Sequence, residues 1–374
     1  MRYLQVIVLV GITLISACGQ EQVDTSGNET SVDSAESSEL VLYLVTEIGV
    51  ELGDSNYVFG LIRDVTFTPE GNVVILDGQK LSVKLFSKDG EFLAANGRAG
   101  EAPGEFQNPQ GLASLGENGI AITDPFSSEI EIFDNNLNHL TTYSNFAGRA
   151  PFVITGTDEG IAGELSGFNR AEGFISTSVS LWEQNTDSVR TYYSIENVFS
   201  PEFMLQRIMK PLATLASDEN NIYYSTPNSE EYTVSVFPID GSESFTLTYP
   251  GYAPIAKSDE DLQQDIADYE FRMQAMQAGG RGGRLAGAEY DPPSEYYATA
   301  SIGIDAEGTI WVQRGWESNP TFDLYVNGET TPTETVFVDP ALNLNGYSFR
   351  ITPEGIAAFN SNPEDYPKVL ILDF

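Results

Sequence analysis

The sequence predicts an all-β protein, a six-bladed β-propeller built from four-stranded antiparallel blades. The first observation is a strand–turn–strand pattern that recurs six times along the 374-residue chain. The second is a further hairpin after each of the first five copies, so that four strands repeat about every 40–50 residues, as in a propeller blade. The copies begin at Asp64, Gly111, Phe152, Leu212, Ala300 and Tyr347.

The first two copies show the strand pattern most clearly. Residues 64–77 form the first hairpin, and residues 82–93 form the second around Ser87-Lys88-Asp89-Gly90. An acidic residue followed by Gly or Asn supplies the positive-φ position that a tight hairpin turn requires. Residues 111–124 and 129–142 repeat both hairpins, so we expect two complete blades before residue 145.

The two ends of the repeat region complement one another. The sixth copy stops at its third strand, Val369–Phe374, whereas Leu40–Val45 is a strand-like segment that belongs to no copy. If these segments pair, the N-terminal segment becomes the outer strand of the sixth blade, and the closed ring leaves no free sheet edge. We therefore expect one propeller domain over residues 40–374.

A Gly- and Pro-rich connection, residues 96–111, follows the first predicted blade. It cannot be a regular strand or helix, because Gly adds backbone freedom and Pro lacks a donor, and we expect Phe106 to wedge between two blades. Gly97–Pro109 resembles the G-R-x-G-x-x-P-G-E-F-x-x-P junction of the NHL-repeat group, and residues 57–135 resemble the six-bladed β-propeller lipoproteins of bacteria. The resemblance implies fold and export and leaves the activity open.

Two connections between predicted blades are much longer than the others, at about 194–210 and 251–297. In the first, Ser200-Pro201-Glu202 is a typical helix start, with a cap, a proline and an acid. In the second, Ser258 and three acids begin a helix that Gly279-Gly280 ends, and its apolar residues recur at steps of three and four. Both helices should lie on one face of the propeller, either packed on the blades or as a lid over the channel.

The N-terminus is typical of a bacterial lipoprotein. Residues 1–17 form a short, positively charged and then apolar signal peptide, and the aliphatic and small residues before Cys18 resemble a lipobox. We expect Cys18 to carry the lipid, residues 18–39 to form a disordered tether, and the outer membrane to be the destination. An ordinary signal peptide with an incidental cysteine is the alternative.

Composition excludes several functions. The formal net charge of −37 opposes nucleic-acid binding. His139, the only histidine, lies beside a turn and is expected to be exposed, which argues against Ser-His-Asp and multi-histidine zinc sites. No cofactor-binding motif is visible. A metal-dependent hydrolase or lactonase that uses carboxylates in the channel remains the alternative function.

Arginine placement gives the preferred functional hypothesis, a non-catalytic module that binds a protein, peptide, glycan or small-molecule ligand, with anionic ligands favoured. Most basic residues map to the connections on one predicted face, and arginine binds carboxylates and phosphates in a bidentate manner. The opposing interpretation is that nearby acids neutralise these arginines. The candidate ligand-binding residues are Arg63, Arg149, Arg207, Arg314 and Arg350.

Overall fold

The computed structural model describes residues 40–374 except residues 145, 147, 170, 184–187, 279–288, 327 and 361–365. Residues 39–374 form one compact unit, which is the subject of this section. The predicted signal peptide, Cys18 and tether lie outside the described residues. Among the described residues, no helix is long and apolar enough to cross a membrane.

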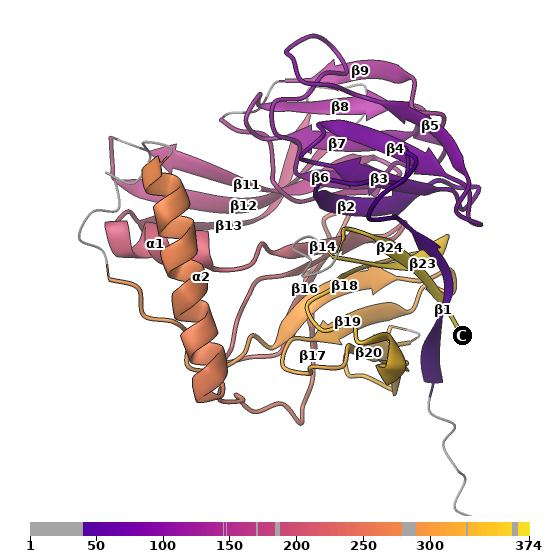
Figure 1. Cartoon of the computed structure of the whole chain (residues 1–374). Coiled ribbons are helices and arrows are strands. Elements are labelled where there is room, and N and C mark those ends of the chain that lie inside the picture. Colours follow the sequence, from indigo (N-terminus) through magenta and orange to yellow (C-terminus); the bar gives the residue numbers. More distant parts are fainter. Residues whose placement is uncertain are drawn as a thin grey trace, which may run out of the picture. The chain divides into compact units, whose positions relative to one another are not determined.

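The unit is an all-β propeller, and four of its sheets are antiparallel blades of four strands (Figure 1). The first holds β2 (Ile62–Phe67), β3 (Val73–Asp77), β4 (Ser82–Phe86) and β5 (Phe92–Asn96). The second holds β6 (Gly111–Ser114), β7 (Ile120–Asp124), β8 (Glu129–Phe133) and β9 (His139–Tyr143). The third holds β10 (Ile154–Thr157), β11 (Gly160–Asn169), β12 (Phe174–Glu183) and β13 (Val189–Val198). The fourth holds β14 (Thr214–Ser217), β15 (Asn221–Ser225), β16 (Thr233–Pro238) and β17 (Phe245–Thr248).

The remaining strands form one eight-stranded sheet, in the order β18-β19-β20-β21-β1-β24-β23-β22. Its strands are β18 (Thr299–Ile304), β19 (Ile310–Arg314), β20 (Thr321–Tyr325), β21 (Glu334–Val338), β1 (Leu40–Ile48), β24 (Val369–Asp373), β23 (Gly355–Phe359) and β22 (Ser348–Thr352).

Strand β1 holds the eight-stranded sheet together. Residues 43–48 pair antiparallel with β24, as the sequence predicted for the two chain ends. Residues 40–42 also pair in parallel with β21, which the sequence did not predict. The chain therefore has five hydrogen-bonded sheets where six separate blades were expected, because a single strand joins the last two groups of strands.

The first strands of the successive strand groups line the centre of the molecule. Strands β2, β6, β10, β14, β18 and β22 each contact the next, and β22 contacts β2. Clusters of buried apolar side chains fill the spaces between neighbouring groups. Phe106 is fully buried in one of these clusters, between Leu76 and Val83 of the first sheet and Leu112 and Ile120 of the second, which confirms its predicted wedge role.

Two buried aspartates hold the connections between sheets in place. The Asp124 carboxylate, at the end of β7, accepts hydrogen bonds from the amides of Gln107 and Asn108 in the Gly- and Pro-rich connection. Asp77, at the end of β3, accepts equivalent bonds from Gly60 and Leu61. Each carboxylate also accepts two amides from the turn that follows its own strand. A buried carboxylate with four N–H donors orders irregular backbone that would otherwise leave these groups unpaired.

The two long connections contain the predicted helices, α1 (Pro201–Met209) and α2 (Asp259–Ala278). The Ser200 hydroxyl caps α1 by accepting the Phe203 amide. The helices lie on the same side of the sheets, beside the long strands β11–β13 (Figure 1). Arg272 of α2 donates to the carbonyl of Ile208 in α1, so the two insertions are joined to one another.

Candidate functional site

The channel has two chemically different ends. We call the N-terminal ends of the six first strands, with the connections that lead into them, the connection face. We call the opposite ends, with the hairpin turns that follow, the turn face. Both helical insertions precede a first strand, α1 before β14 and α2 before β18, so they belong to the connection face.

Arg350, in β22, is held by the neighbouring first strand. Its guanidinium donates to the Asp64 carboxylate and, at 3.1 Å, to the Val65 carbonyl. Asp64 is 6% exposed, and its second oxygen accepts the amide of Leu112 at 2.8 Å. The pair therefore links β22 to β2 and β2 to β6, and the charge of Arg350 is compensated within the fold.

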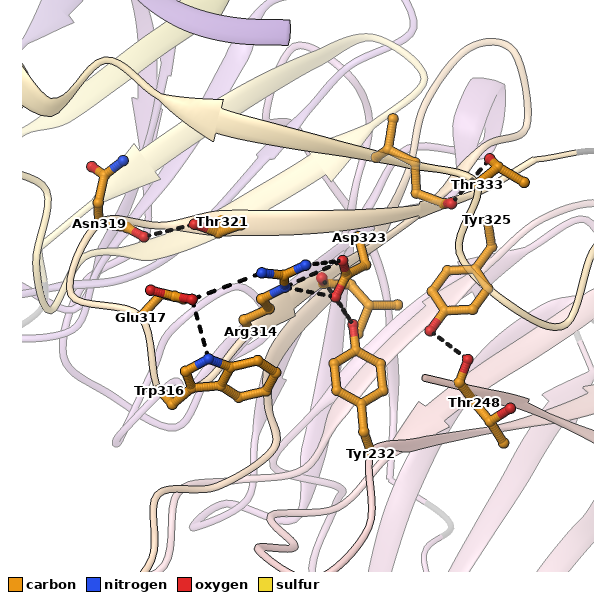
Figure 2. A network of polar contacts seen from close by, with 12 residues as sticks. Tyr232, Thr248, Arg314, Trp316, Glu317, Asn319, Thr321, Asp323, Tyr325 and Thr333 are labelled. Atoms are coloured by element: carbon orange, nitrogen blue, oxygen red, sulfur yellow. Dashed lines mark hydrogen bonds and ion pairs between the residues drawn. The ribbon is translucent and has the colours of Figure 1, made fainter. Parts of the chain in front are cut away.

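Arg314, at the end of β19, lies in a dense polar network (Figure 2). Its guanidinium forms a two-pronged contact with Asp323 of β20, with nitrogen–oxygen distances of 2.8 to 3.2 Å. Asp323 is fully buried and also accepts the Tyr232 hydroxyl at 2.8 Å. Burial, with Asp323 next in importance, raises the pKa of Tyr232, so this hydroxyl stays protonated and keeps donating.

Aromatic rings surround the same guanidinium. It lies 5.4 Å from the ring centre of Tyr249 and 5.7 Å from that of Trp316, which is within range of cation–π attraction. Trp316 donates its indole N–H to Glu317, whose carboxylate is also 3.7 Å from Arg314. Trp311 and Tyr325, the other aromatic residues near Arg314 in the sequence, are buried in the packing between sheets, and only Trp316 is partly exposed.

Arg207 projects from α1 toward the long strands of the third sheet. It donates to Thr177 at 3.0 Å and to Ser166, and Glu164 lies 3.6 Å away. Glu164 in turn accepts the Tyr224 hydroxyl at 2.7 Å. Burial raises the pKa of Tyr224, so it remains a donor to Glu164. Like Arg314 and Arg350, Arg207 has an acid beside it.

Arg63, beside Asp64 in β2, differs from these three. It is half-buried, and within the described part of the chain its buried Nε has no hydrogen-bond partner and its guanidinium no ion pair. Burial lowers the pKa of this arginine, a sign of an uncompensated charge. Its alkyl chain passes so close to Gly78 that a side chain there would overlap it.

Arg149, in the connection into β10, also lacks an ion pair among the residues that the structure describes. Its guanidinium is exposed and lies 5.0 Å from the ring centre of Phe126, which packs edge-on against Phe152.

The prediction for His139 was wrong. The side chain is 22% exposed and its Nε2 lies 2.6 Å from the Glu131 carboxylate, which is 2% exposed. Glu131 also accepts the Gly104 amide and the Thr142 hydroxyl, so the pair joins the outer strand β9 to the Gly- and Pro-rich connection. A glutamate at an inward position of the Glu-Ile-Glu-Ile-Phe strand was the available signal, since an unpaired carboxylate would not be buried there.

A cavity lies at the turn face, opposite the predicted arginine-lined face. Its volume is about 190 Å³, and it is lined by first strands and the hairpin turns that follow four of them. Among the described residues, Arg350 is the only basic one in its wall, and Asp158, Asp218 and Glu354 lie in the turns at its mouth. Within the described residues, no group of three or more His, Cys, Asp or Glu side chains is arranged to hold a metal ion.

No protein-family model matches this sequence, and no curated protein matches it significantly. Among solved structures, the chain is similar to the WD40 repeats of RRP9, with a TM-score of 0.48, 11% identity and coverage of 90% of this chain and 99% of that one. A DUF4221 family member from Bacteroides vulgatus gives a TM-score of 0.48, 10% identity and coverage of 90% and 98%. Virginiamycin B lyase from Staphylococcus aureus gives a TM-score of 0.40 and 12% identity, with coverage of 89% of this chain and 99% of that one. Likeness at this level does not indicate what this chain binds or catalyses.

Proposed function

We propose that this protein is a lipid-anchored cell-envelope propeller that binds an anionic ligand at its connection face without catalysing a reaction. The observation that carries the proposal is Arg63, whose half-buried guanidinium has no ion pair within the described residues. A carboxylate or phosphate group of a ligand would compensate this charge.

The five candidate arginines then divide into two groups. Arg63 and Arg149, without ion pairs among the described residues, are the proposed ligand contacts. Arg207, Arg314 and Arg350 each have an acid beside them, so we assign them to the frame that positions the connection face. Neutralisation by a nearby acid, the opposing interpretation for the five arginines, therefore applies to three of them.

The proposed fold has six blades, with the eight-stranded sheet counted as two. A buried cluster lies between its two halves, where Phe322 of β20 packs edge-on against Phe349 of β22 with ring centres 5.1 Å apart. A sheet whose halves pack face to face is bent into two layers, as two neighbouring propeller blades are. Strand β1 would then be the outer strand of the sixth blade, with its first three residues reaching across to the fifth.

The proposed anchor rests on the N-terminal sequence. Cys18 is the only cysteine, it follows an apolar segment and small residues, and the Ser- and acid-rich residues 19–39 separate it from the propeller. In a Gram-negative host we expect the wild type in the outer-membrane fraction and Cys18→Ser released from it. Palmitate labelling that persists in the Cys18→Ser variant would contradict lipidation at this residue.

The binding proposal can be tested on residues 40–374 by titration calorimetry with inorganic phosphate, succinate and citrate. We expect Arg63→Gln and Arg149→Gln each to weaken the binding of the tightest probe at least about tenfold, the loss of one charge-assisted contact. Lys88→Gln is the matched control, because it removes the same charge from the exposed β4–β5 turn on the turn face. Equal affinities for all four proteins would refute the assignment of the connection face.

A further inference from the structure

The turn-face cavity shares no lining residue with the arginine contacts proposed above. Its volume of about 190 Å³ is well above that of a single water molecule. It is also below the roughly 300–1,000 Å³ of pockets that hold drug-sized ligands. A ligand that fills it would therefore be a small molecule.

Hydroxyl groups dominate the polar wall. Thr66, Ser114, Thr155, Thr157, Ser217 and Thr352 all line the cavity. Thr155 and Ser217 already bond to one another across neighbouring sheets at 2.9 Å. Thr66 is different, because it is 3% exposed and its hydroxyl has no hydrogen-bond partner among the described residues.

The Thr66 hydroxyl can both donate to and accept from a ligand in the cavity. Ser114, on the next first strand, also has no side-chain partner in the described ranges. Two free hydroxyls on adjacent strands fit a ligand that itself carries several hydroxyl groups. The apolar side chains of Leu215, Ile302 and Ile304, in the same wall, suit the C–H surface of such a molecule.

The charges around the cavity favour an uncharged ligand over an anion. Arg350 is the only cation that the described residues place in the wall, and it is bound to Asp64 and the Val65 carbonyl. The acids at the mouth repel negative ligands.

We propose that the turn-face cavity binds a small, uncharged polyhydroxylated molecule, a monosaccharide or a sugar alcohol. The ligand exchanges hydrogen bonds with Thr66 and Ser114 and lies against the isoleucine and leucine side chains. The site shares no contact residue with the anion site at Arg63 and Arg149, so either proposal can fail without the other.

The test is titration calorimetry of residues 40–374 with xylose, glucose and sorbitol, and with glucuronate as the charged counterpart of glucose. We expect saturable binding of at least one neutral probe and binding of glucuronate at least about tenfold weaker than that of glucose. Absence of saturable binding by all three neutral probes up to about 100 mM overturns the proposal, as does preferential binding of glucuronate.

Variants locate the site. We expect Thr66→Val to weaken the binding of the neutral probe at least about fivefold, since one hydrogen bond contributes about 1 kcal/mol. Thr66→Ser, which keeps the hydroxyl, should retain binding and guards against a folding defect in the valine variant. Thr246→Val, on the exposed outer strand β17, should leave the affinity unchanged. A Thr66→Val protein that folds and binds like the wild type refutes the assignment.

Discussion

The guanidinium of Arg350 donates to the carboxylate of Asp64, a residue 286 positions earlier in the chain. Asp64 also accepts the amides of Val65 and Leu112, so one buried carboxylate joins the first strands β22, β2 and β6. Its role resembles that of β1 at the outer edge, because both connect the last strands of the chain to its first ones.

Arg350→Gln is expected to destabilise the propeller by at least about 2 kcal/mol. Removing one partner of a fully buried pair costs roughly 3–5 kcal/mol, and the 22% exposure of the Arg350 side chain lowers the expected value. Urea unfolding would measure the loss. The double variant Arg350→Gln/Asp64→Asn should be more stable than the sum of the single losses predicts, because it leaves no unpaired charge. Strict additivity would show that the two residues do not stabilise one another.

His139→Ala is expected to cost about 1–3 kcal/mol, because Glu131 loses one of its three donors inside the protein. The loss should appear in thermal or urea unfolding. Glu131→Gln keeps the shape of the side chain and removes the charge, so we expect it to reduce the effect of a subsequent His139→Ala change. Exposed Asn136→Ala, in the turn before β9, is the control and should be neutral within about 0.5 kcal/mol.

The sequence predicted those features that repeat or that have local signals. The hairpins of the first two blades, the strand at residues 40–45 and the Ser200 cap of α1 were all predicted from short segments, and the structure contains them. The parallel pairing of residues 40–42 with β21 was not predicted, because three paired residues leave no periodic pattern. Which arginines are neutralised also could not be predicted, since Arg350 finds its acid almost at the other end of the chain.

Lys84 gives the stability a defined pH dependence. Its ammonium donates to the carbonyls of Ser55, Asn56 and Val58, and burial, followed by the nearby charge of Lys80, lowers its pKa from 10.5 to about 8. Between pH 8 and 10.5 the unfolded chain still holds this proton while the folded chain has lost it. The contribution of Lys84 to the free energy of unfolding should therefore rise with pH in this window, by at most about 1.4 kcal/mol per unit.

Urea unfolding of the wild type and Lys84→Met at several pH values from 7 to 10 would measure this effect. The free energy of unfolding should rise more steeply with pH in the wild type than in Lys84→Met. This difference in slope does not depend on the stability of the variant at pH 7. The range ends at pH 10 because buried tyrosines begin to lower the free energy of unfolding above this pH. Burial raises the pKa of Tyr297 to about 12, so above pH 10 the unfolded chain loses this proton before the folded chain does. Parallel curves for the two proteins would contradict a lowered pKa at Lys84.

Phe106→Ala is expected to destabilise the protein by about 3–5 kcal/mol, because it leaves a cavity between the first two sheets. Gly97→Ala should also be harmful, since Gly97 has a φ of +87° and an added methyl group would overlap the Phe106 ring. Gly173→Ala is the control, with a φ of +72° and open space around it, so it reports the backbone strain alone. A Gly97→Ala loss no larger than that of Gly173→Ala would show that the Phe106 contact is unimportant.

Removal of β1 tests whether this strand completes the propeller. A protein that begins at residue 40 keeps β1, whereas one that begins at residue 49 exposes the edge of β24 and loses the buried side chains of Leu42 and Ile48. Burial of each such side chain contributes about 1.5–3 kcal/mol, so the shorter protein should be destabilised by at least several kcal/mol. An unpaired β24 should also promote self-association, because an exposed strand edge pairs with other chains. Urea unfolding and size-exclusion chromatography would measure both effects, and equal stability of the two proteins would mean that β1 is an accessory strand.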